Sequence, residues 1–302
     1  MIPMQSARPQ TNVPPAIPSS PRLQTIVDAA VQRTLEQFSA KNLRPEEIAV
    51  TLVDLRDPAQ PVWGSYRGGE QIYPASVIKL FYLVAAHRWM ADGKLRDTEE
   101  LRRALRDMIV DSYNEATGLV VDSLTDTTSG PELSPGEMEV WYEKRNAVNR
   151  YFTSAGFTNI NVNRKPWCEG PYGREMQSVR LHKPNHRNWL TTDATARLFM
   201  EIVTGQSITP ERSVQMMELL KRRPFEKNAE GQSIEFTGPA LPEGAKLWSK
   251  AGWTSETRHD AAYVELPTGE HFVLVIFTVN HSKERDIIST AARAVIEGLR
   301  PK

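Results

Sequence analysis

The stretch KLWSKAGWTSETRHDAAYVELPTGEHFVLVIFTV, residues 246–279, decides the fold. It holds three short segments, 246–253, 259–267 and 271–279, and a Pro-Thr-Gly-Glu turn separates the last two. Apolar segments of this length bounded by turn residues predict β-strands. The segment 271–279 is apolar on both alternations, which is typical of a central strand that is covered on both faces.

Two segments nearer the N-terminus predict the remaining strands of the sheet. Residues 48–55 (IAVTLVDL) and 62–66 (VWGSY) also predict strands. Helical periodicity marks the two segments that flank all five strands. The apolar positions are Leu23, Ile26, Val27, Ala30, Val31, Leu35 and Phe38 in the first, and Ile287, Ile288, Ala291, Ala292, Val295, Ile296 and Leu299 in the last. We therefore expect a five-stranded antiparallel sheet, built from both ends of the chain and flanked by these helices.

The middle of the chain is helical in pattern, which predicts a second lobe. Two helices are expected over 98–124 with a break near Ser112, one over 138–155, and further ones over 192–203 and 210–220. The fold class is thus a two-lobed α/β (α+β) arrangement. Its expected parts are a Pro-rich flexible tail at 1–22, a discontinuous sheet lobe at 23–88 and 206–302, and an all-helical lobe at 89–205 that includes an aperiodic Ω-like loop at 157–190.

The composition of the 302 residues excludes several classes of function. The 37 basic and 37 acidic residues cancel, so charge gives no reason to expect a nucleic-acid partner. No stretch approaches the roughly 20 apolar residues of a membrane span. Cys168 is the only cysteine, so an intrachain disulfide cannot form. The first 22 residues hold six prolines and no apolar segment typical of a secretory signal. We expect a periplasmic or secreted protein if a leader was removed, and otherwise a cytoplasmic one.

Ser76 and Lys79 are the first candidates for chemistry. Their spacing places them one turn apart on the same face of a predicted helix that begins near Ala75. Backbone N–H groups at a helix N-terminus stabilise a developing negative charge, and a nearby lysine can act as the base that a serine lacks. The pattern S-x-x-K alone is weak, because about one chance match is expected in a chain of this length.

Two further motifs follow in order and strengthen this interpretation. Ser112-Tyr113-Asn114 is the only S-x-N of the chain and lies at the predicted helix break. Lys250-Ala251-Gly252 is the only K-x-G and lies on a predicted strand. In this order the three motifs resemble the signature of class A β-lactamases and penicillin-binding proteins. The resemblance extends over roughly residues 22–300 and includes YPASVIKLF, LRRALRDMIVDSYNEAT and TTDATARLFMEIV.

The resemblance implies a role for each motif residue. Ser76 would be the acylated nucleophile and Lys79 its base, while Ser112 would pass a proton to the leaving group. Asn114 would bind the amide side chain of the substrate. Lys250 would lower the pKa of Ser112 and help to hold the substrate carboxylate.

The third motif would also supply part of the substrate site, with one departure from the family. The oxyanion hole would come from the backbone N–H groups of Ser76 and Trp253, next to Gly252. Ala251 stands where the family usually has Thr or Ser, so one hydroxyl for the substrate carboxylate is missing. Arg258 either compensates for that hydroxyl or is an edge-strand charge that blunts aggregation.

The loop at 157–190 matches the family least well. Family members hold a glutamate there that activates the deacylating water, and here Glu169 and Glu175 are the candidates. Glu169 is preferred, because its Pro and Trp neighbours could desolvate it and raise its pKa. Two solvent-exposed loop carboxylates remain the alternative, and the acyl-enzyme would then persist. His182 and His186 do not predict a metal site, and Cys168 is interpreted as a small buried hydrophobic residue.

Three functions stay open on the sequence alone. The first is acyl-enzyme hydrolysis of a β-lactam amide. The second is a D,D-peptidase, esterase or amidase on the same scaffold, acting on a peptidoglycan-like substrate. The third is a penicillin-binding protein that is acylated without efficient turnover. In each case we expect a monomer with a small-molecule substrate and with no cofactor or metal.

Overall fold

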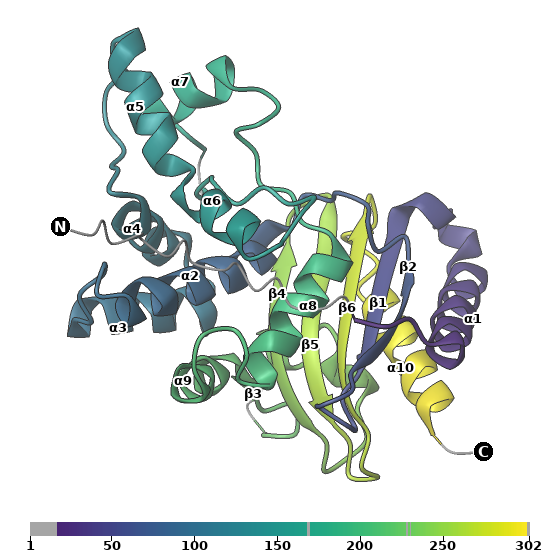
Figure 1. Cartoon of the computed structure of the whole chain (residues 1–302). Coiled ribbons are helices and arrows are strands. Elements are labelled where there is room, and N and C mark those ends of the chain that lie inside the picture. Colours follow the sequence, from purple (N-terminus) through teal and green to yellow (C-terminus); the bar gives the residue numbers. More distant parts are fainter. Residues whose placement is uncertain (1–16, 168–169, 228, 230, 301–302) are drawn as a thin grey trace, which may run out of the picture.

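The sheet is the centre of the computed structural model, which describes residues 17–167, 170–227, 229 and 231–300 (Figure 1). All neighbouring strands are antiparallel, in the order β2-β1-β6-β5-β4-β3. The strands are β1 (Ile48–Asp54), β2 (Val62–Tyr66), β3 (Lys221–Arg222), β4 (Lys246–Trp253), β5 (Thr257–Glu265) and β6 (His271–Val279). The predicted five strands are confirmed, but the total of five was wrong. The sixth strand, β3, has two residues, and so short a segment shows no periodicity.

The position of β6 explains why its sequence is apolar on both alternations. It lies between β1 and β5, and both of its faces are buried. Val273, Val275 and Phe277 pack into the cluster on the side of the nucleophile. Leu274 and Ile276 pack into the cluster on the opposite face. The prediction of a central, doubly covered strand is confirmed.

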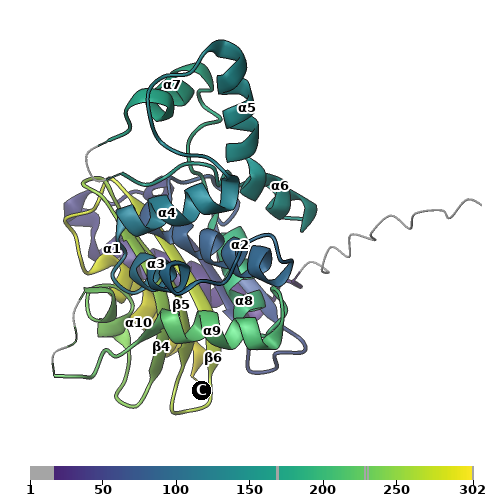
Figure 2. The ribbon, with the colours of Figure 1, turned by 90° about the vertical axis from the view of Figure 1, so that its left-hand side faces the viewer.

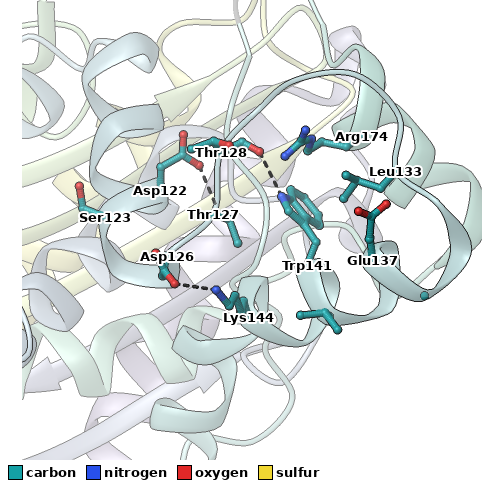
Figure 3. Close-up of a pocket in the computed structure, with 12 residues that line it drawn as sticks. Asp122, Ser123, Asp126, Thr127, Thr128, Leu133, Glu137, Trp141, Lys144 and Arg174 are labelled. Atoms are coloured by element: carbon teal, nitrogen blue, oxygen red, sulfur yellow. Dashed lines mark hydrogen bonds and ion pairs between the residues drawn. The ribbon is translucent and has the colours of Figure 1, made fainter.

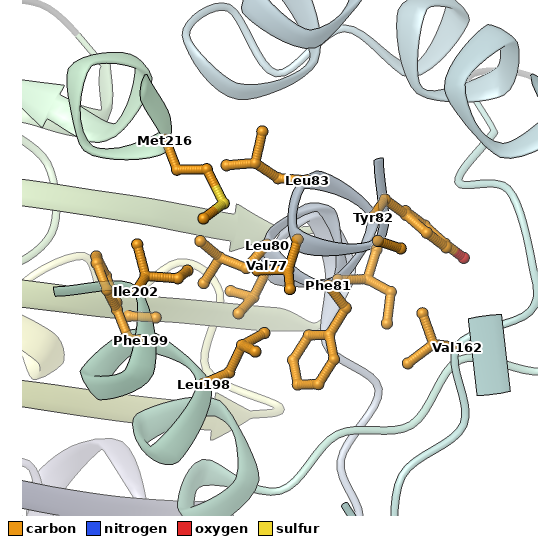
Figure 4. Close-up of a cluster of buried hydrophobic side chains, with 14 of the residues drawn as sticks. Val77, Leu80, Phe81, Tyr82, Leu83, Val162, Leu198, Phe199, Ile202 and Met216 are labelled. Atoms are coloured by element: carbon orange, nitrogen blue, oxygen red, sulfur yellow. The ribbon is translucent and has the colours of Figure 1, made fainter. Parts of the chain in front are cut away.

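Helices cover both faces of the sheet. On one face lie α1 (Pro21–Gln37) and α10 (Ile287–Leu299), and on the other lies α8 (Thr192–Val203), as Figure 1 shows. Within the sheet, α8 contacts β1, β5 and β6, although its sequence falls within the range expected for the helical lobe. The apolar side chains of α2 (Lys79–Ala91) meet those of α8 and α9 (Pro210–Leu220) in one core cluster (Figure 4).

The remaining long helices stand away from the sheet, most clearly α5 and α7 (Figures 1 and 2). They are α3 (Glu99–Ile109), α4 (Asn114–Thr125), α5 (Pro135–Arg145), α6 (Ala147–Ser154) and α7 (Gly173–Leu181). The predicted break near Ser112 separates α3 from α4. The single helix predicted over 138–155 is two helices, because Asn146 ends α5 and precedes α6.

The Ω-like loop expected at 157–190 contains one helix, α7, which the sequence pattern did not predict. The buried residues of α7 are Glu175, Gln177 and Ser178. A helix that buries polar side chains has no apolar stripe, and therefore no periodic signal in the sequence.

The predicted tail is shorter than expected. Residues 1–16 lie outside the described residues, but Ile17 is buried and Ser19 bridges to Trp63 of β2. The hydroxyl of Ser20 accepts a hydrogen bond from the Leu23 amide at 3.3 Å, which caps α1 one turn ahead of its apolar stripe. Residues 17–22 are therefore structured.

Short 3-10 turns connect several elements: η1 (Ser39–Lys41), η2 (Pro45–Glu47), η3 (Ala75–Ile78), η4 (Gly231–Ser233) and η5 (Gly238–Ala240). Two of them, η3 and η4, carry residues of the candidate site. Within the described residues, no helix has the length and hydrophobicity that crossing a membrane requires.

Candidate active site

Ser76 lies on η3, directly ahead of α2, and its side chain is partly accessible among buried neighbours. The residue before it, Ala75, has a φ of 45°, a left-handed conformation that is uncommon for a residue with a Cβ. The 3-10 turn and the start of α2 place Lys79 one turn after Ser76, as the spacing predicts. Backbone strain at a residue next to a candidate nucleophile is typical of functional sites.

His259 of β5 anchors the segment that leads to Ser76. Its Nδ1 accepts a hydrogen bond from the Thr278 amide at 3.1 Å, so Nε2 carries the proton and donates to the Tyr73 carbonyl at 2.9 Å. Burial lowers the pKa of His259 to about 4, which keeps the ring neutral near pH 7. The sheet thus fixes the backbone three residues ahead of the nucleophile.

The strand β4 passes directly beside Ser76. A Cβ on Gly252 would lie 2.7 Å from the backbone nitrogen of Ser76 and 2.8 Å from the carbonyl oxygen of Pro74. Only a glycine allows two backbones to approach this closely. The third predicted motif therefore meets the first at the backbone of the candidate nucleophile.

Lys79 connects the first motif with the second. Its side chain is fully buried, and Nζ donates to the carbonyl oxygen of Ser112 at 2.6 Å and to Oδ1 of Asn114 at 2.8 Å. The Oγ of Ser112 lies 3.2 Å from the same Nζ. Ser112 itself has a φ of 60°, so the turn between α3 and α4 presents its hydroxyl in a conformation that serine rarely adopts.

Lys250 of β4 reaches the same hydroxyl from the other side. Its Nζ lies 3.0 Å from Oγ of Ser112 and also donates to the Ala251 carbonyl at 2.8 Å. Burial, followed by the nearby charges of Lys79 and Arg222, holds the pKa of Lys250 well below its ordinary value. The Ser112 hydroxyl is thus within hydrogen-bond distance of two lysine amino groups.

Two side chains that the sequence analysis did not select hold this arrangement together. Gln232 of η4 accepts a hydrogen bond from Nζ of Lys250 at 2.8 Å. Arg222 of β3 donates to the carbonyl oxygens of Ile109 and Ser249, which belong to α3 and β4. Both side chains are buried. No sequence motif marks them, since a buried Gln or Arg in a loop or a two-residue strand has no characteristic spacing.

The two other residues expected at the substrate site lie at the end of β4 and the start of β5. Trp253 is exposed, and its ring lies 5.7 Å from that of Phe236. Arg258 is buried over the same Phe236 ring and donates to the Glu235 carboxylate at 2.9 Å. Because β5 is an interior strand, the interpretation of Arg258 as an edge-strand charge was wrong. Its compensation for the missing hydroxyl at Ala251 stays a prediction.

The structure separates the two candidate glutamates. Glu169, like Cys168, lies outside the described residues. Glu175 is fully buried in the helical lobe, where its Oε1 accepts hydrogen bonds from Arg145 at 2.7 Å and from Ser129 at 3.2 Å. Lys165 lies 3.5 Å from the same oxygen. The description of Glu175 as an exposed loop carboxylate was therefore wrong, because its charge is part of a buried ion pair.

The two histidines of the Ω-like loop are packed against aromatic rings. The ring of His182 stacks on Tyr142 at 3.6 Å, and burial lowers the pKa of His186 to about 3. Across the described ranges, no group of three or more His, Cys, Asp or Glu side chains is arranged to hold a metal ion.

Two cavities are lined in part by α4, and Asp122 belongs to both. One, of about 440 Å³, begins at Asn114 and runs between α4 and residues 165–167, with Tyr172 also in its wall. The other, of about 780 Å³, lies between α4, α5 and Arg174 and contains the Asp126–Lys144 ion pair (Figure 3). Of these two, only the first is lined by Asn114, which contacts Lys79 of the lysine–serine network.

Taken together, the contacts of Lys79, Ser112 and Lys250 form one connected polar network, which is close to Ser76 in the sequence at Lys79 and in the fold at β4. A partly accessible hydroxyl on η3 lies one turn from a buried lysine, and that lysine shares a second hydroxyl with another buried lysine of depressed pKa. Such a chain can take a proton from an attacking hydroxyl and deliver it to a leaving group. Backbone N–H groups at the start of a helix lie beside it and can stabilise an oxyanion.

Comparisons with known proteins show the family and the fold of the chain. A family model described as the beta-lactamase enzyme family matches residues 29–299. The structure of a β-lactamase from Sphaerobacter thermophilus is similar at a TM-score of 0.64 and 20% identity, over 91% of this chain and 99% of that one. A β-lactamase from Chitinophaga pinensis is similar at a TM-score of 0.66 and 16% identity, over 90% and 99%.

A third similar structure is that of a point mutant of PBP-A, described as an acyl-enzyme complex with penicillin G. Its TM-score is 0.64 at 18% identity, over 93% of this chain and 97% of that one. No curated protein matches the chain. At these identities the structural likeness shows the fold, and the match to the family model extends over most of the chain.

Proposed function

Because the chain belongs to the β-lactamase enzyme family, we propose that it is a serine hydrolase that accepts the acyl group of a β-lactam on Ser76 and transfers it to water. The observation that carries this proposal is the placement of the Ser112 hydroxyl 3.2 Å from Lys79 and 3.0 Å from Lys250. Lys250 lies on β4, the strand whose Gly252 approaches the backbone of Ser76, and this supports a common role for the three motifs.

In the acylation step, Oγ of Ser76 attacks the carbonyl carbon of the lactam. Lys79, in its neutral form, takes the hydroxyl proton, and the C–O bond forms as the lactam C–N bond breaks. The proton passes through the Ser112 hydroxyl to the departing nitrogen, so the ring opens without net change in protons. The backbone N–H groups of Ser76 and Trp253 hold the negative charge on the carbonyl oxygen.

Two buried lysines next to one hydroxyl make this transfer feasible near neutral pH. Burial and the nearby charge of Lys79 both lower the pKa of Lys250. A lysine of lowered pKa gives up its proton more easily, which suits it to proton transfer. Asn114, which accepts a hydrogen bond from Lys79, also lines the smaller cavity and is placed to bind the amide of the substrate.

Hydrolysis of the acyl-enzyme needs a group that activates water, and we assign this role to Glu169. The alternative carboxylate, Glu175, is held in its ion pair with Arg145. The proposal is tested by nitrocefin hydrolysis with the native protein and with Ser76→Ala. Turnover that disappears in Ser76→Ala supports it, and equal turnover by both proteins contradicts it.

A second candidate is a penicillin-binding protein or a D,D-peptidase that releases its acyl group slowly. The burial of Glu175 favours it, because one of the two candidate glutamates of the loop is then held in an ion pair with Arg145 and is not available to activate water. The likeness to PBP-A, of which one mutant is described as an acyl-enzyme with penicillin G, is consistent with it. Stoichiometric acylation without further turnover, or release of D-Ala from a D-Ala-D-Ala peptide, would select this candidate.

A further inference from the structure

Gln232 occupies a buried position between the second and third motifs. It lies on η4, and 7% of its surface is exposed. On one side is the end of α3, which leads through Ile109 and Val110 to Ser112. On the other side is β4 with Lys250. The side chain of Gln232 forms hydrogen bonds with both segments and so joins them directly.

The amide of Gln232 uses its full hydrogen-bonding capacity in this position. Its Oε1 accepts from Nζ of Lys250 at 2.8 Å and from the backbone nitrogen of Ala251 at 2.9 Å. Its Nε2 donates to the carbonyl oxygens of Ile109 at 3.2 Å and of Val110 at 3.0 Å. A flipped amide would turn N–H groups toward two donors and an oxygen toward two acceptors, so the partners determine its orientation.

We propose that Gln232 is a positioning residue that holds the amino group of Lys250 in contact with the Ser112 hydroxyl and sets the protonation of Lys250. The inference rests on the proposed function of the site, since it concerns the same proton relay. Gln232 contacts Lys250 directly and acts on the relay through that lysine.

The charges around Lys250 make its protonation sensitive to a single acceptor. Burial, Lys79 and Arg222 all disfavour the ammonium form, and only the Asp260 carboxylate among the charged neighbours favours it. Against this background, an oxygen at 2.8 Å from Nζ stabilises the charged form by direct hydrogen bonding. Removal of that oxygen should lower the pKa of Lys250, and a carboxylate in its place should raise it.

The first experiment measures the pKa of Lys250 without any substrate. The side-chain signals of labelled lysine are titrated by NMR, and Lys250 is identified by the signal that Lys250→Met lacks. We expect Gln232→Leu to lower the pKa of Lys250 and Gln232→Glu to raise it by about one unit or more, since a new charge within hydrogen-bond distance shifts a pKa by that order. A merely structural glutamine would give shifts of the same sign in both variants, and that result would overturn the proposal.

The chain offers a matched control for the loss of a buried glutamine. Gln177 of α7 is also buried, and its amide exchanges two hydrogen bonds with the backbone of Leu133 at 2.7 and 2.8 Å. It lies in the helical lobe, away from the lysine–serine network. Gln177→Leu should lower the thermal stability much as Gln232→Leu does, while the titration of Lys250 stays unchanged. A shift of Lys250 in Gln177→Leu would overturn the proposal.

The second experiment measures acylation by nitrocefin as a function of pH. Gln232→Leu should slow acylation roughly tenfold or more at pH 7, with an altered pH profile, whereas in a Ser112→Ala background the same change should alter the rate less than about twofold. An effect of equal size in both backgrounds contradicts an action through Ser112. If no β-lactam reacts with the native protein, the proposed function fails, and the NMR titration still decides the role of Gln232.

Discussion

The α-carbon of Gly252 faces the backbone amide of Ser76 so closely that a Cβ would lie 2.7 Å from the Ser76 nitrogen and 2.9 Å from that of Val77. Ser76 comes from η3, directly ahead of α2, and Gly252 comes from β4, near the other end of the chain. The candidate oxyanion hole, with N–H groups from Ser76 and Trp253, depends on this approach of β4 to η3.

Replacement of Gly252 by alanine should therefore damage the site directly. The added Cβ pushes β4 away from η3, and we expect acylation by nitrocefin to fall roughly tenfold or more, because an oxyanion-hole donor is displaced. Gly69→Ala is the control, since a Cβ there meets no atom within 4 Å. Unchanged acylation in Gly252→Ala would contradict this account of the oxyanion hole.

The two lysines should be separable by their effects on acylation. Lys79→Met removes the proposed base, and general-base catalysis is worth roughly 10²- to 10⁴-fold in rate. Lys250→Met removes the second amino group at the Ser112 hydroxyl and should slow the same step by roughly 10². Stopped-flow acylation rates test both variants. Native rates in either variant would remove that lysine from the mechanism.

Substitution of the two glutamates of the Ω-like loop should affect different properties, stability in one case and the lifetime of the acyl-enzyme in the other. Glu175→Gln breaks a buried ion pair with Arg145 and should lower the free energy of unfolding by about 3 kcal/mol, with little change in the lifetime of the acyl-enzyme. Glu169→Gln should lengthen that lifetime roughly tenfold or more and leave stability nearly unchanged. Denaturant unfolding and mass-monitored deacylation measure the two effects. The reverse pattern would assign the water-activating role to Glu175.

The control for both substitutions is Glu143→Gln. Glu143 pairs with Arg150 at 2.9 Å on the surface, where 73% of its side chain is exposed. Exposed pairs contribute little to stability, so this variant should match the native protein in both measurements.

Acid should destabilise the fold before most carboxylates are protonated. Burial lowers the pKa of His87 and His259 to about 4 and that of His186 to about 3, against about 6.5 in an unfolded chain. The unfolded state therefore binds more protons below about pH 6.5, and stability falls as the pH drops from there toward 4. At pH 5 each histidine accounts for about 2 kcal/mol of this loss.

The histidine effect is measured by urea unfolding at pH 7 and pH 5. His87 has a buried Nδ1 without a hydrogen-bond partner within the described chain, so His87→Phe removes a protonation site without breaking a hydrogen bond of that atom. The stability lost between pH 7 and pH 5 should shrink by about 2 kcal/mol in this variant. An equal loss in the native and variant proteins would contradict a buried neutral His87.

The sequence predicts those parts of the molecule whose residues repeat with the period of their element. The segment 271–279 is apolar on both alternations because both faces of β6 are covered, and the stripes of α1 and α10 face the sheet. The segment of α7 carries no such signal, because it buries Glu175, Gln177 and Ser178. A polar side chain is buried where it finds hydrogen-bond or ion-pair partners, and these partners are distant in the sequence. A local sequence pattern therefore cannot predict its burial.

The residues of the candidate site also fall into a group that the sequence predicts and a group that it does not. Ser76, Ser112 and Lys250 could be chosen because each belongs to a motif of fixed spacing, and the structure brings Ser112 and Lys250 to 3.0 Å. Gln232 could not be chosen, since its position depends on the loop that returns from β3 to β4. The packing of Arg258 on Phe236 and Glu235 is likewise a tertiary contact without a local signature.

The central claim is that Ser76 is acylated, and intact-protein mass measured during incubation with benzylpenicillin tests it most directly. The account predicts an adduct with the mass of the whole β-lactam, located on the peptide that contains Ser76 and absent from Ser76→Ala. Loss of that adduct with time would show hydrolysis, and its persistence would show a penicillin-binding protein. An adduct that survives in Ser76→Ala, or neither adduct nor consumption of the β-lactam by the native protein, would contradict the claim.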